Sequence, residues 1–192
     1  MSRWQFVKQF CREPRKIGAI APSSQKLARR MLQPINFNRA RVIVEYGSGT
    51  GAFTRQVFER IDRDKTIFFG FELNEQMNRI ANENVPEVTI FQDSAAEIRK
   101  YLRQYGVKHA DAVISGLPWA VFPEELQDDI LYETIMGLKK GGVFTTFAYL
   151  HGLMLPSGIR FRKKLNKHFS EVKTSPVVWN NIPPALVYWC RK

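Results

Sequence analysis

Short runs of apolar residues alternate with helix-patterned segments along most of this 192-residue chain. Five runs have the length and the nearly unbroken apolar character of strands buried on both faces of a parallel sheet. The five predicted strands are 42–46, 66–71, 88–91, 111–115 and 143–147. Helical patterns follow the first strand, begin again near Glu75, and run from Glu124 to about Lys139, and Gly141-Gly142 is expected to turn the chain into the fifth strand. This alternation predicts an α/β domain.

The end of the chain departs from that alternation. Residues 169–179 and 185–190 are predicted to be two strands joined around 180–184, which makes a terminal antiparallel hairpin. The hairpin brings the expected sheet to seven strands, mostly parallel, between two layers of helices. The whole is a three-layer fold.

Residues 1–40 are predicted to form a helical extension that precedes the domain of residues 41–192. Ser23 or Ser24 is placed to cap a helix over 25–32, and Pro34 closes that helix. An extension before the first strand is expected to lie over the mouth of the sheet.

The first twelve residues have an amphipathic helical pattern. The apolar side of that helix consists of Trp4, Phe6, Val7, Phe10 and Cys11. The polar side consists of Gln5, Lys8, Gln9 and Arg12. Aromatic residues opposite basic ones are typical of a helix that lies in a membrane interface. The alternative is a helix that packs its aromatic side on the core or caps a ligand pocket. The polar residues interrupt any apolar run, so a signal peptide is not expected.

A glycine-rich turn follows the first predicted strand, and glycines there let the backbone pass close to a ligand. The turn reads Glu45-Tyr46-Gly47-Ser48-Gly49-Thr50-Gly51. Its spacing differs from the G-x-G-x-x-G of dinucleotide sites, and no Lys-Ser or Lys-Thr follows it as in a phosphate-binding P-loop. The acidic residue before the turn suits a cationic ligand with an amino acid moiety, such as S-adenosylmethionine. A tight strand-to-helix connection without a ligand is the alternative.

Two further acidic residues follow the next two strands. Glu72 ends the second strand about 20 residues after the glycine turn, the separation at which a carboxylate can bind both ribose hydroxyls. Asp93 follows the third strand and can accept a hydrogen bond from an adenine amino group. Taken alone, Glu72 is equally consistent with an ordinary carboxylate at a strand end, and Asp93 with a helix cap. In this order the three features predict an S-adenosylmethionine site, to which we also assign the neighbouring residues Leu73, Ser94, Ala95, Ser115, Gly116 and Leu117.

Candidate acceptor-binding residues follow the fourth and fifth strands, where ligands of open α/β sheets bind. After the fourth strand come Pro118 and Trp119, and after the fifth come Tyr149 and His151. We expect the last two to orient the acceptor or assist proton loss, and structural polar residues at a strand end are the alternative. Trp119 is expected to stack on the acceptor or form an apolar wall, and plain packing is its alternative.

The formal charge of +11 is concentrated in the two ends of the chain. Residues 1–41 carry ten basic residues against one acid, residues 156–192 carry eight against one, and 42–155 carry eleven against sixteen. Such asymmetry indicates an anionic partner, either a nucleic acid or an anionic membrane surface, with solubility alone as the alternative. The segment 159–169 is a second basic amphipathic stretch. Its expected membrane-binding residues are Arg160, Arg162, Lys163 and Lys164.

Cysteine and histidine residues give no sign of a metal site or a disulfide framework. Cys11 and Cys190 stand at opposite ends of the chain without a CxxC pair, and the three histidines are scattered. The cysteine pattern fits a reduced cytosolic protein.

The glycine turn, Glu72, Asp93 and the sequence Ser115-Gly-Leu-Pro-Trp119 resemble the class I S-adenosylmethionine-dependent methyltransferases over roughly residues 40–192. Within that group the chain resembles bacterial phospholipid N-methyltransferases, which are related to ribosomal RNA adenine dimethylases. Residues 10–24 and Tyr149-Leu-His151 are similar to the lipid subfamily. The resemblance implies a Rossmann-like doubly wound fold and S-adenosyl-L-methionine as cofactor, with S-adenosyl-L-homocysteine as product.

One position separates the possible acceptors. Adenine-N6 methylases resemble one another in an Asn/Asp-Pro-Pro-aromatic or Asn-Leu-Pro-Tyr motif, whose first side chain accepts a hydrogen bond from the exocyclic amine. The matching residue here is Gly116, which has no side chain, although Ser115 is adjacent. This difference favours a lipid headgroup amine over a base.

The resemblance and the charge pattern together predict methyl transfer to the amine of phosphatidylethanolamine. We expect a monomer in the cytoplasm, peripherally associated with the anionic phospholipid surface on the inner face of the membrane. The alternatives are a ribosomal RNA adenine N6-methyltransferase and a catalytically inactive membrane-peripheral protein that binds the cofactor.

Overall fold

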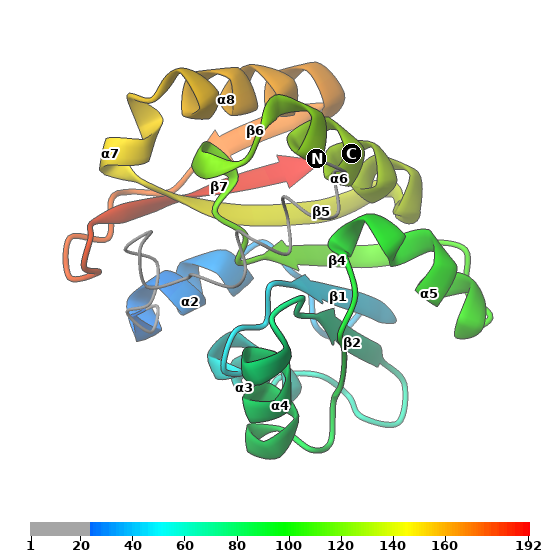
Figure 1. The fold of residues 1–192 in the computed structure, drawn as a ribbon. Coiled ribbons are helices and arrows are strands. Elements are labelled where there is room, and N and C mark those ends of the chain that lie inside the picture. Colours follow the sequence, from blue (N-terminus) through cyan, green and yellow to red (C-terminus); the bar gives the residue numbers. More distant parts are fainter. Residues whose placement is uncertain (1–23) are drawn as a thin grey trace.

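The computed structural model describes residues 24–192, and the predicted amphipathic helix at residues 2–12 lies outside this range. The described chain forms one seven-stranded sheet with helices on both faces (Figure 1). The strands are β1 Val42–Tyr46, β2 Ile67–Phe71, β3 Thr89–Phe91, β4 Ala110–Ser115, β5 Leu138–Tyr149, β6 Glu171–Thr174 and β7 Ala185–Arg191. The principal helices are α2 Gln25–Leu32, α3 Ala52–Phe58, α4 Glu75–Asn84, α5 Ile98–Gln104, α6 Glu124–Gly137, α7 Leu150–Leu153 and α8 Pro156–His168.

The strand order is β3-β2-β1-β4-β5-β7-β6. Strands β1 to β5 pair in parallel, and β7 pairs antiparallel with both β5 and β6. The predicted mostly parallel sheet with a terminal antiparallel hairpin is therefore confirmed. The chain runs outward from β1 through β2 to β3 and then returns to β4 on the other side of β1. This reversal opens a crevice at the carboxyl ends of β1 and β4, where ligands bind in such sheets.

Each face of the sheet buries its own apolar cluster. On one face, α5, α6 and α8 contribute residues such as Leu102, Leu131 and Phe161. On the other face, α2, α3 and α4 contribute residues such as Met31 and Val57. Strand β1 lies between the two clusters and is buried along its whole length, which explains its unbroken apolar pattern.

Helix α2 packs on the face of the sheet formed by β5 and β7. The side chain of Ser24 caps the helix by accepting a hydrogen bond from the Leu27 amide. The indole of Trp189 donates to the Arg30 carbonyl oxygen at 2.8 Å. The Ser24 amide donates to Asn181 Oδ1 at 2.9 Å, so α2 also contacts the loop that joins β6 to β7. The division of the chain into an extension of residues 1–40 and a domain of residues 41–192 stays a prediction.

Two predicted boundaries are wrong. Gly141 and Gly142 lie within the fifth strand, because β5 already begins at Leu138. The strand bulges between Leu138, which pairs with Ala110, and Val143, which pairs with Ala112. Gly141 takes the left-handed conformation that the bulge requires, with φ +74°. The first hairpin strand ends at Thr174 instead of reaching residue 179.

No helix between residues 24 and 192 has the length and apolar character needed to cross a bilayer.

Candidate functional site

The glycine turn between β1 and α3 lies at the carboxyl end of the sheet. The amides of Gly47 and Ser48 both donate to the carbonyl oxygen of Phe71, at 2.8 and 3.1 Å, which ties the turn to the end of β2. Gly49 has a positive φ of +57°, and a Cβ added to it would meet nothing within 4 Å. The backbone at Gly49 therefore faces open space, as required of a loop that lies against a ligand.

Glu45 is a buried carboxyl group directly beneath this turn. Its Oε2 accepts hydrogen bonds from Thr54 Oγ1 at 2.6 Å and from Ser48 Oγ at 3.2 Å. Its Oε1 is buried and has no hydrogen-bond partner within residues 24–192. Burial raises the pKa of Glu45 to about 7, although both hydroxyl donors lower it. A buried acidic oxygen without a partner fits a cationic ligand group, because the ligand would supply the missing donor.

Glu72 connects the glycine turn to the end of β2. Its Oε2 accepts from the Gly49 amide at 2.9 Å, and its Oε1 accepts from the Asn74 amide at 2.8 Å. Burial raises the pKa of Glu72, and the backbone donors, which include the Leu73 amide, oppose that shift. A carboxylate has about four acceptor positions, so with these three backbone donors about one remains for a hydroxyl donor of a ligand.

Asp93 follows β3 and has more partners than the sequence indicated. Its Oδ1 accepts from the Ser94 amide at 2.8 Å, and its Oδ2 accepts from Tyr101 Oη at 2.9 Å and Lys100 Nζ at 3.1 Å. Partial burial would raise the pKa of Asp93, but these donors outweigh it and the pKa is lowered. Ser94 caps the next turn through the Ala96 amide. The Asp93 carboxylate is therefore ionised and held in place at the strand end.

The end of β4 meets the glycine turn in the crevice. The Gly116 amide donates to the Tyr46 carbonyl oxygen at 2.7 Å. A Cβ on Gly116 would lie 2.9 Å from the Gly47 carbonyl oxygen, and a Cβ on Gly47 would lie 3.0 Å from Leu117 Cδ2. The fold thus brings the predicted residues of 45–51 and 115–117 side by side.

Trp119 forms part of the core and also of a pocket wall. Only 2% of the residue is exposed, its indole Nε1 donates to Ser115 Oγ at 3.0 Å, and its ring stacks on Phe161 with centroids 4.5 Å apart. The Gln127 side chain donates to the Trp119 carbonyl oxygen at 2.7 Å. One face of the indole is therefore covered by α8.

An apolar pocket of about 60 Å³ lies beside Trp119, between the end of β4 and the end of β5. The lining residues with polar side-chain atoms are Trp119, Tyr149, His151 and Tyr188. The rings of Tyr149 and His151 stack with an interplanar angle of 8°. Burial raises the pKa of Tyr149, so its hydroxyl stays protonated at neutral pH. The other lining residues are Pro118, Ala120, Val121, Phe147, Ala148, Gly152, Leu153, Leu155, Gly158 and Phe161.

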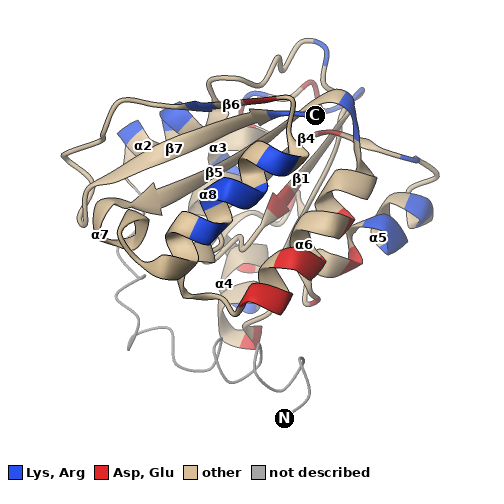
Figure 2. Cartoon of the chain, turned by 90° about the horizontal axis from the view of Figure 1, so that it is seen from above, with Lys and Arg blue, Asp and Glu red and all other residues tan. Residues whose placement is uncertain are grey.

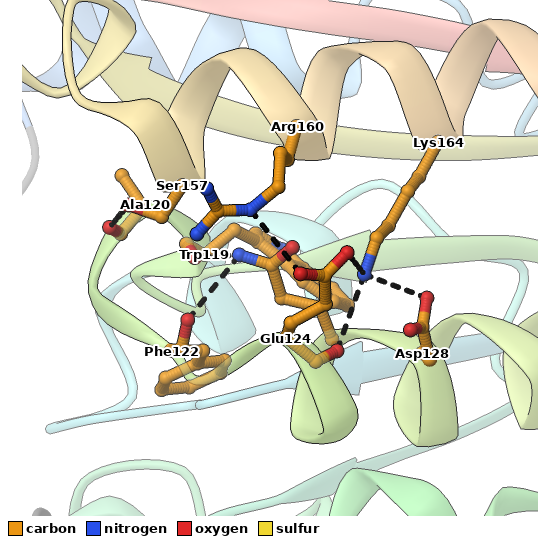
Figure 3. A network of polar contacts seen from close by, with 9 residues as sticks. Trp119, Ala120, Phe122, Glu124, Asp128, Ser157, Arg160 and Lys164 are labelled. Atoms are coloured by element: carbon orange, nitrogen blue, oxygen red, sulfur yellow. Dashed lines mark hydrogen bonds and ion pairs between the residues drawn. The ribbon is translucent and has the colours of Figure 1, made fainter.

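The basic residues of α8 divide into two groups. Lys164 contacts Asp128 Oδ1 at 2.7 Å and Glu124 Oε1 at 3.4 Å, and Arg160 contacts Glu124 Oε2 at 3.4 Å (Figure 3). Both cations pair with α6, but only Lys164 is largely buried there, whereas the Arg160 side chain is still 47% exposed. Arg162 and Lys163 are exposed and pair with no carboxylate of residues 24–192. The other predicted membrane residues, Trp4, Phe6, Lys8, Phe10 and Arg12, lie outside the described range.

Three residues of the cofactor side of the site were missed by sequence reasoning. Thr54 makes the shorter hydrogen bond to Glu45, and Tyr101 holds Asp93. Gly70 leaves room for Ser48, because a Cβ on Gly70 would lie 2.4 Å from Ser48 Oγ. The position of Thr54, one helical turn after the glycines, was the available signal for that residue. Nothing in the spacing marks the other two.

Metal ligation has no candidate in the same region. Within the part of the chain that the structure describes, no three His, Cys, Asp or Glu side chains form a group that could hold a metal ion. Cys190 is buried in β7.

Comparison with known proteins identifies the family. No protein-family model matches the chain. A protein from Singulisphaera acidiphila described as an ornithine lipid N-methyltransferase is 30% identical over 189 residues, which cover 97% of this chain and 94% of that one. An O-methyltransferase from Bacillus cereus in complex with SAH has a similar fold, with a TM-score of 0.69 and 11% identity over 96% of this chain and 91% of that chain. An S-adenosylmethionine-dependent O-methyltransferase from Thermotoga maritima matches with a TM-score of 0.66 and 16% identity over 95% of this chain and 71% of that chain. The sequence-based assignment is confirmed, and the chain belongs to the class I S-adenosylmethionine-dependent methyltransferases.

Proposed function

We propose that this methyltransferase acts on the primary amine of a membrane-lipid headgroup, with phosphatidylethanolamine as the expected acceptor. The observation that carries the proposal is Gly116, which stands where base methylases have a side-chain acceptor for the exocyclic amine. A Cβ at this position would lie 2.9 Å from the Gly47 carbonyl oxygen. This oxygen belongs to the backbone, so it could move away only if the glycine turn were distorted. This backbone therefore leaves no room for the Asn or Asp that a base substrate requires.

The adjacent pocket supports a lipid acceptor. Its walls are mostly apolar, and its polar side-chain atoms belong to Trp119, Tyr149, His151 and Tyr188. A membrane lipid likewise has a polar and an apolar part, because its headgroup carries one amine and a few oxygens beside the acyl chains. The relative from Singulisphaera acidiphila, named for ornithine lipid, adds support for a lipid substrate. Ornithine lipid and phosphatidylethanolamine share a primary amine, so that amine is the common chemistry.

S-adenosylmethionine is the cofactor, and when bound it supplies an electrophilic methyl group on a sulfonium. In the proposed site, Glu45 would accept from its amino group, Glu72 from a ribose hydroxyl and Asp93 from its adenine amine. The Gly49 backbone would lie against it, where a side chain would fill the space.

The acceptor amine needs a free electron pair, and a protonated ammonium group has none. We assign the proton transfer to His151, whose imidazole lines the pocket and can accept the ammonium proton on a ring nitrogen. Tyr149 is protonated, so its hydroxyl can donate a hydrogen bond to a headgroup oxygen. The stacked rings hold each other in orientation. Alignment of the amine with the methyl group of the cofactor would supply the rest of the rate enhancement.

The test is an assay with radiolabelled S-adenosylmethionine and three separate acceptors: vesicles with phosphatidylethanolamine, vesicles with ornithine lipid, and total RNA. We expect label in phosphatidylethanolamine. Label in ornithine lipid alone would keep the lipid amine and correct the headgroup, whereas label in RNA alone or in none of the three would refute the proposal.

A matched pair of variants tests the role of His151. Replacing a general base removes about 10²-fold or more of the rate, so His151→Gln should lower kcat by at least that factor near neutral pH. His109→Gln makes the same change at an exposed position before β4, at the opposite edge of the sheet, and should leave kcat unchanged. Equal rates in both variants would exclude His151 as the proton acceptor.

A further inference from the structure

The three most exposed large apolar side chains of residues 24–192 belong to two neighbouring segments. Met154 is 82% exposed, Ile182 is 79% exposed and Trp179 is 69% exposed. Met154 directly follows α7, and the other two lie in the loop between β6 and β7. Scattered single apolar residues on a surface need no explanation, but a grouped set marks an interaction site. We name these three residues the apolar edge.

Backbone contacts bring the two segments together at the end of β5. Tyr149, the last residue of β5, pairs with Ala185, the first residue of β7. The Leu150 amide at the start of α7 donates to the Pro184 carbonyl oxygen at 3.0 Å. Figure 1 shows α7 and the loop before β7 side by side at the left end of the sheet. Leu153 and Leu155 line the pocket, so Met154 between them lies at the border of the pocket described above.

Positive charge without an ion-pair partner in residues 24–192 lies farther along α8, in the half of the helix away from Met154. Helix α8 begins two residues after Met154, and its exposed cations Arg162, Lys163 and Lys167 pair with no carboxylate of residues 24–192 (Figure 2). The acidic residues Glu124 and Asp128 on the neighbouring helix α6 are occupied by Arg160 and Lys164. The surface therefore combines exposed apolar side chains with free cations, which is the chemistry that binds an anionic membrane interface.

We infer that the apolar edge and the free cations of α8 seat this protein on an anionic lipid bilayer, with the pocket turned toward the headgroups. The inference rests on the proposed lipid substrate and adds the surface that contacts the membrane. It differs from the sequence-based expectation in two ways. Arg160 and Lys164 are structural ion-pair partners, and the loop between β6 and β7 contributes the apolar contact.

The test compares one triple variant and one double variant of the full chain on vesicles of phosphatidylcholine and phosphatidylglycerol. The edge variant carries Met154→Gln, Trp179→Gln and Ile182→Gln, and its apolar control carries Tyr132→Gln and Met136→Gln. The control residues are 59% and 42% exposed on α6, away from the carboxyl edge. We expect the edge variant to bind vesicles at least about tenfold more weakly than the control, because interfacial affinity scales with buried apolar area.

A second pair isolates the charge contribution. The test variant combines Arg162→Gln with Lys163→Gln and removes two cations of α8. The control combines Arg103→Gln with Lys108→Gln and removes the same number of charges near the opposite edge of the sheet. Loss of two basic residues near an anionic surface is expected to weaken binding by roughly tenfold or more, whereas the distant pair should have a much smaller effect. Equal effects would show that only net charge matters and would overturn the assignment to α8.

Activity on a short-chain phosphatidylethanolamine below its critical micelle concentration separates this inference from the proposed function. The edge variant should methylate that monomeric lipid at the wild-type rate and lose activity only on vesicles. No activity on any lipid, with vesicle binding still lost in the edge variant, would refute the proposed function and leave the docking surface standing. Unchanged vesicle binding in the edge variant, or a dimer in solution that the same variant dissociates, would overturn the inference.

Discussion

Glu45 lies in the core beneath the glycine turn, and its ionisation should govern both stability and cofactor binding. Burial raises its pKa from 4.5 to about 7. The folded protein therefore holds the proton more tightly than the unfolded chain does. The stabilisation that this proton provides is fully present below about pH 4.5 and is lost as the pH rises toward about 7. For these two pKa values the loss between about pH 5 and about pH 8 is roughly 2–3 kcal/mol.

Glu45→Gln removes the ionisation and nearly preserves the shape of the side chain. The amide oxygen can still accept from Ser48 and Thr54, whereas the amide nitrogen lies where Oε1 now has no partner. An unpaired amide has its own cost of about 1–3 kcal/mol, but that cost does not depend on pH. Comparing the pH profiles of wild type and variant therefore cancels it. What remains is the titration of Glu45.

Urea unfolding of both proteins across this pH range measures the difference. We expect the free energy of unfolding of the wild type to fall by about 2–3 kcal/mol more than that of Glu45→Gln as the pH rises from about 5 to about 8. Glu72, whose pKa burial also raises, is present in both proteins, so its contribution largely cancels. Parallel profiles would show that Glu45 is already ionised at low pH and would refute the reasoning. Calorimetry should show weaker binding of S-adenosylmethionine to the variant, since it lacks the carboxylate that we assign to the amino group of the cofactor.

Two further substitutions test the packing around the site. Gly70→Ala would place a Cβ 2.4 Å from Ser48 Oγ, so calorimetry should show at least about a tenfold loss of cofactor affinity. Adding Ser48→Ala should recover part of that affinity. A Gly70→Ala protein with unchanged affinity would show that the turn adjusts freely. Trp119→Phe loses the hydrogen bond to Ser115 and part of the stacking on Phe161, so urea unfolding should show a loss of about 2 kcal/mol, and a loss below about 0.5 kcal/mol would contradict the core role of the indole.

The sequence predicted the fold and the order of the cofactor-site residues because both depend on local patterns. A strand, a glycine turn and a helix occupy adjacent positions, and Glu72 and Asp93 each end a strand of the same parallel sheet. Carboxyl ends of parallel strands lie at one edge, so sequence order was sufficient to bring these residues together.

What the sequence did not predict depends on contacts between distant residues. Tyr101 reaches Asp93 only because α5 packs over the end of β3. Lys164 resembled a free surface cation until α8 was placed beside α6 and its acids. No periodicity in either segment encodes these pairings. A basic stretch alone therefore overestimates the positive surface that is available to a partner.

The apolar edge was hidden by a misassigned strand. Residues 175–179 have a β-like composition, but Pro176 has no amide proton to donate to a ladder. The chain leaves the sheet after Thr174, and Val178 returns only as an isolated bridge to Ala185. Trp179 is consequently displayed to solvent in a loop instead of being paired in a sheet. The exposure of this side chain is a product of the break that Pro176 imposes.

The two halves of the proposed site are physically connected through the end of β4. Ser115 accepts the Trp119 indole proton, Trp119 packs on Phe161 of α8, and Gly116 is bonded to the Tyr46 carbonyl oxygen beside the glycine turn. These contacts fix the pocket wall relative to the cofactor turn, while α8 carries the cations that we assign to the membrane. In the proposed site, an acceptor that enters from the apolar edge would therefore meet the cofactor beside Gly116, where the backbone of the glycine turn occupies the space of a side chain.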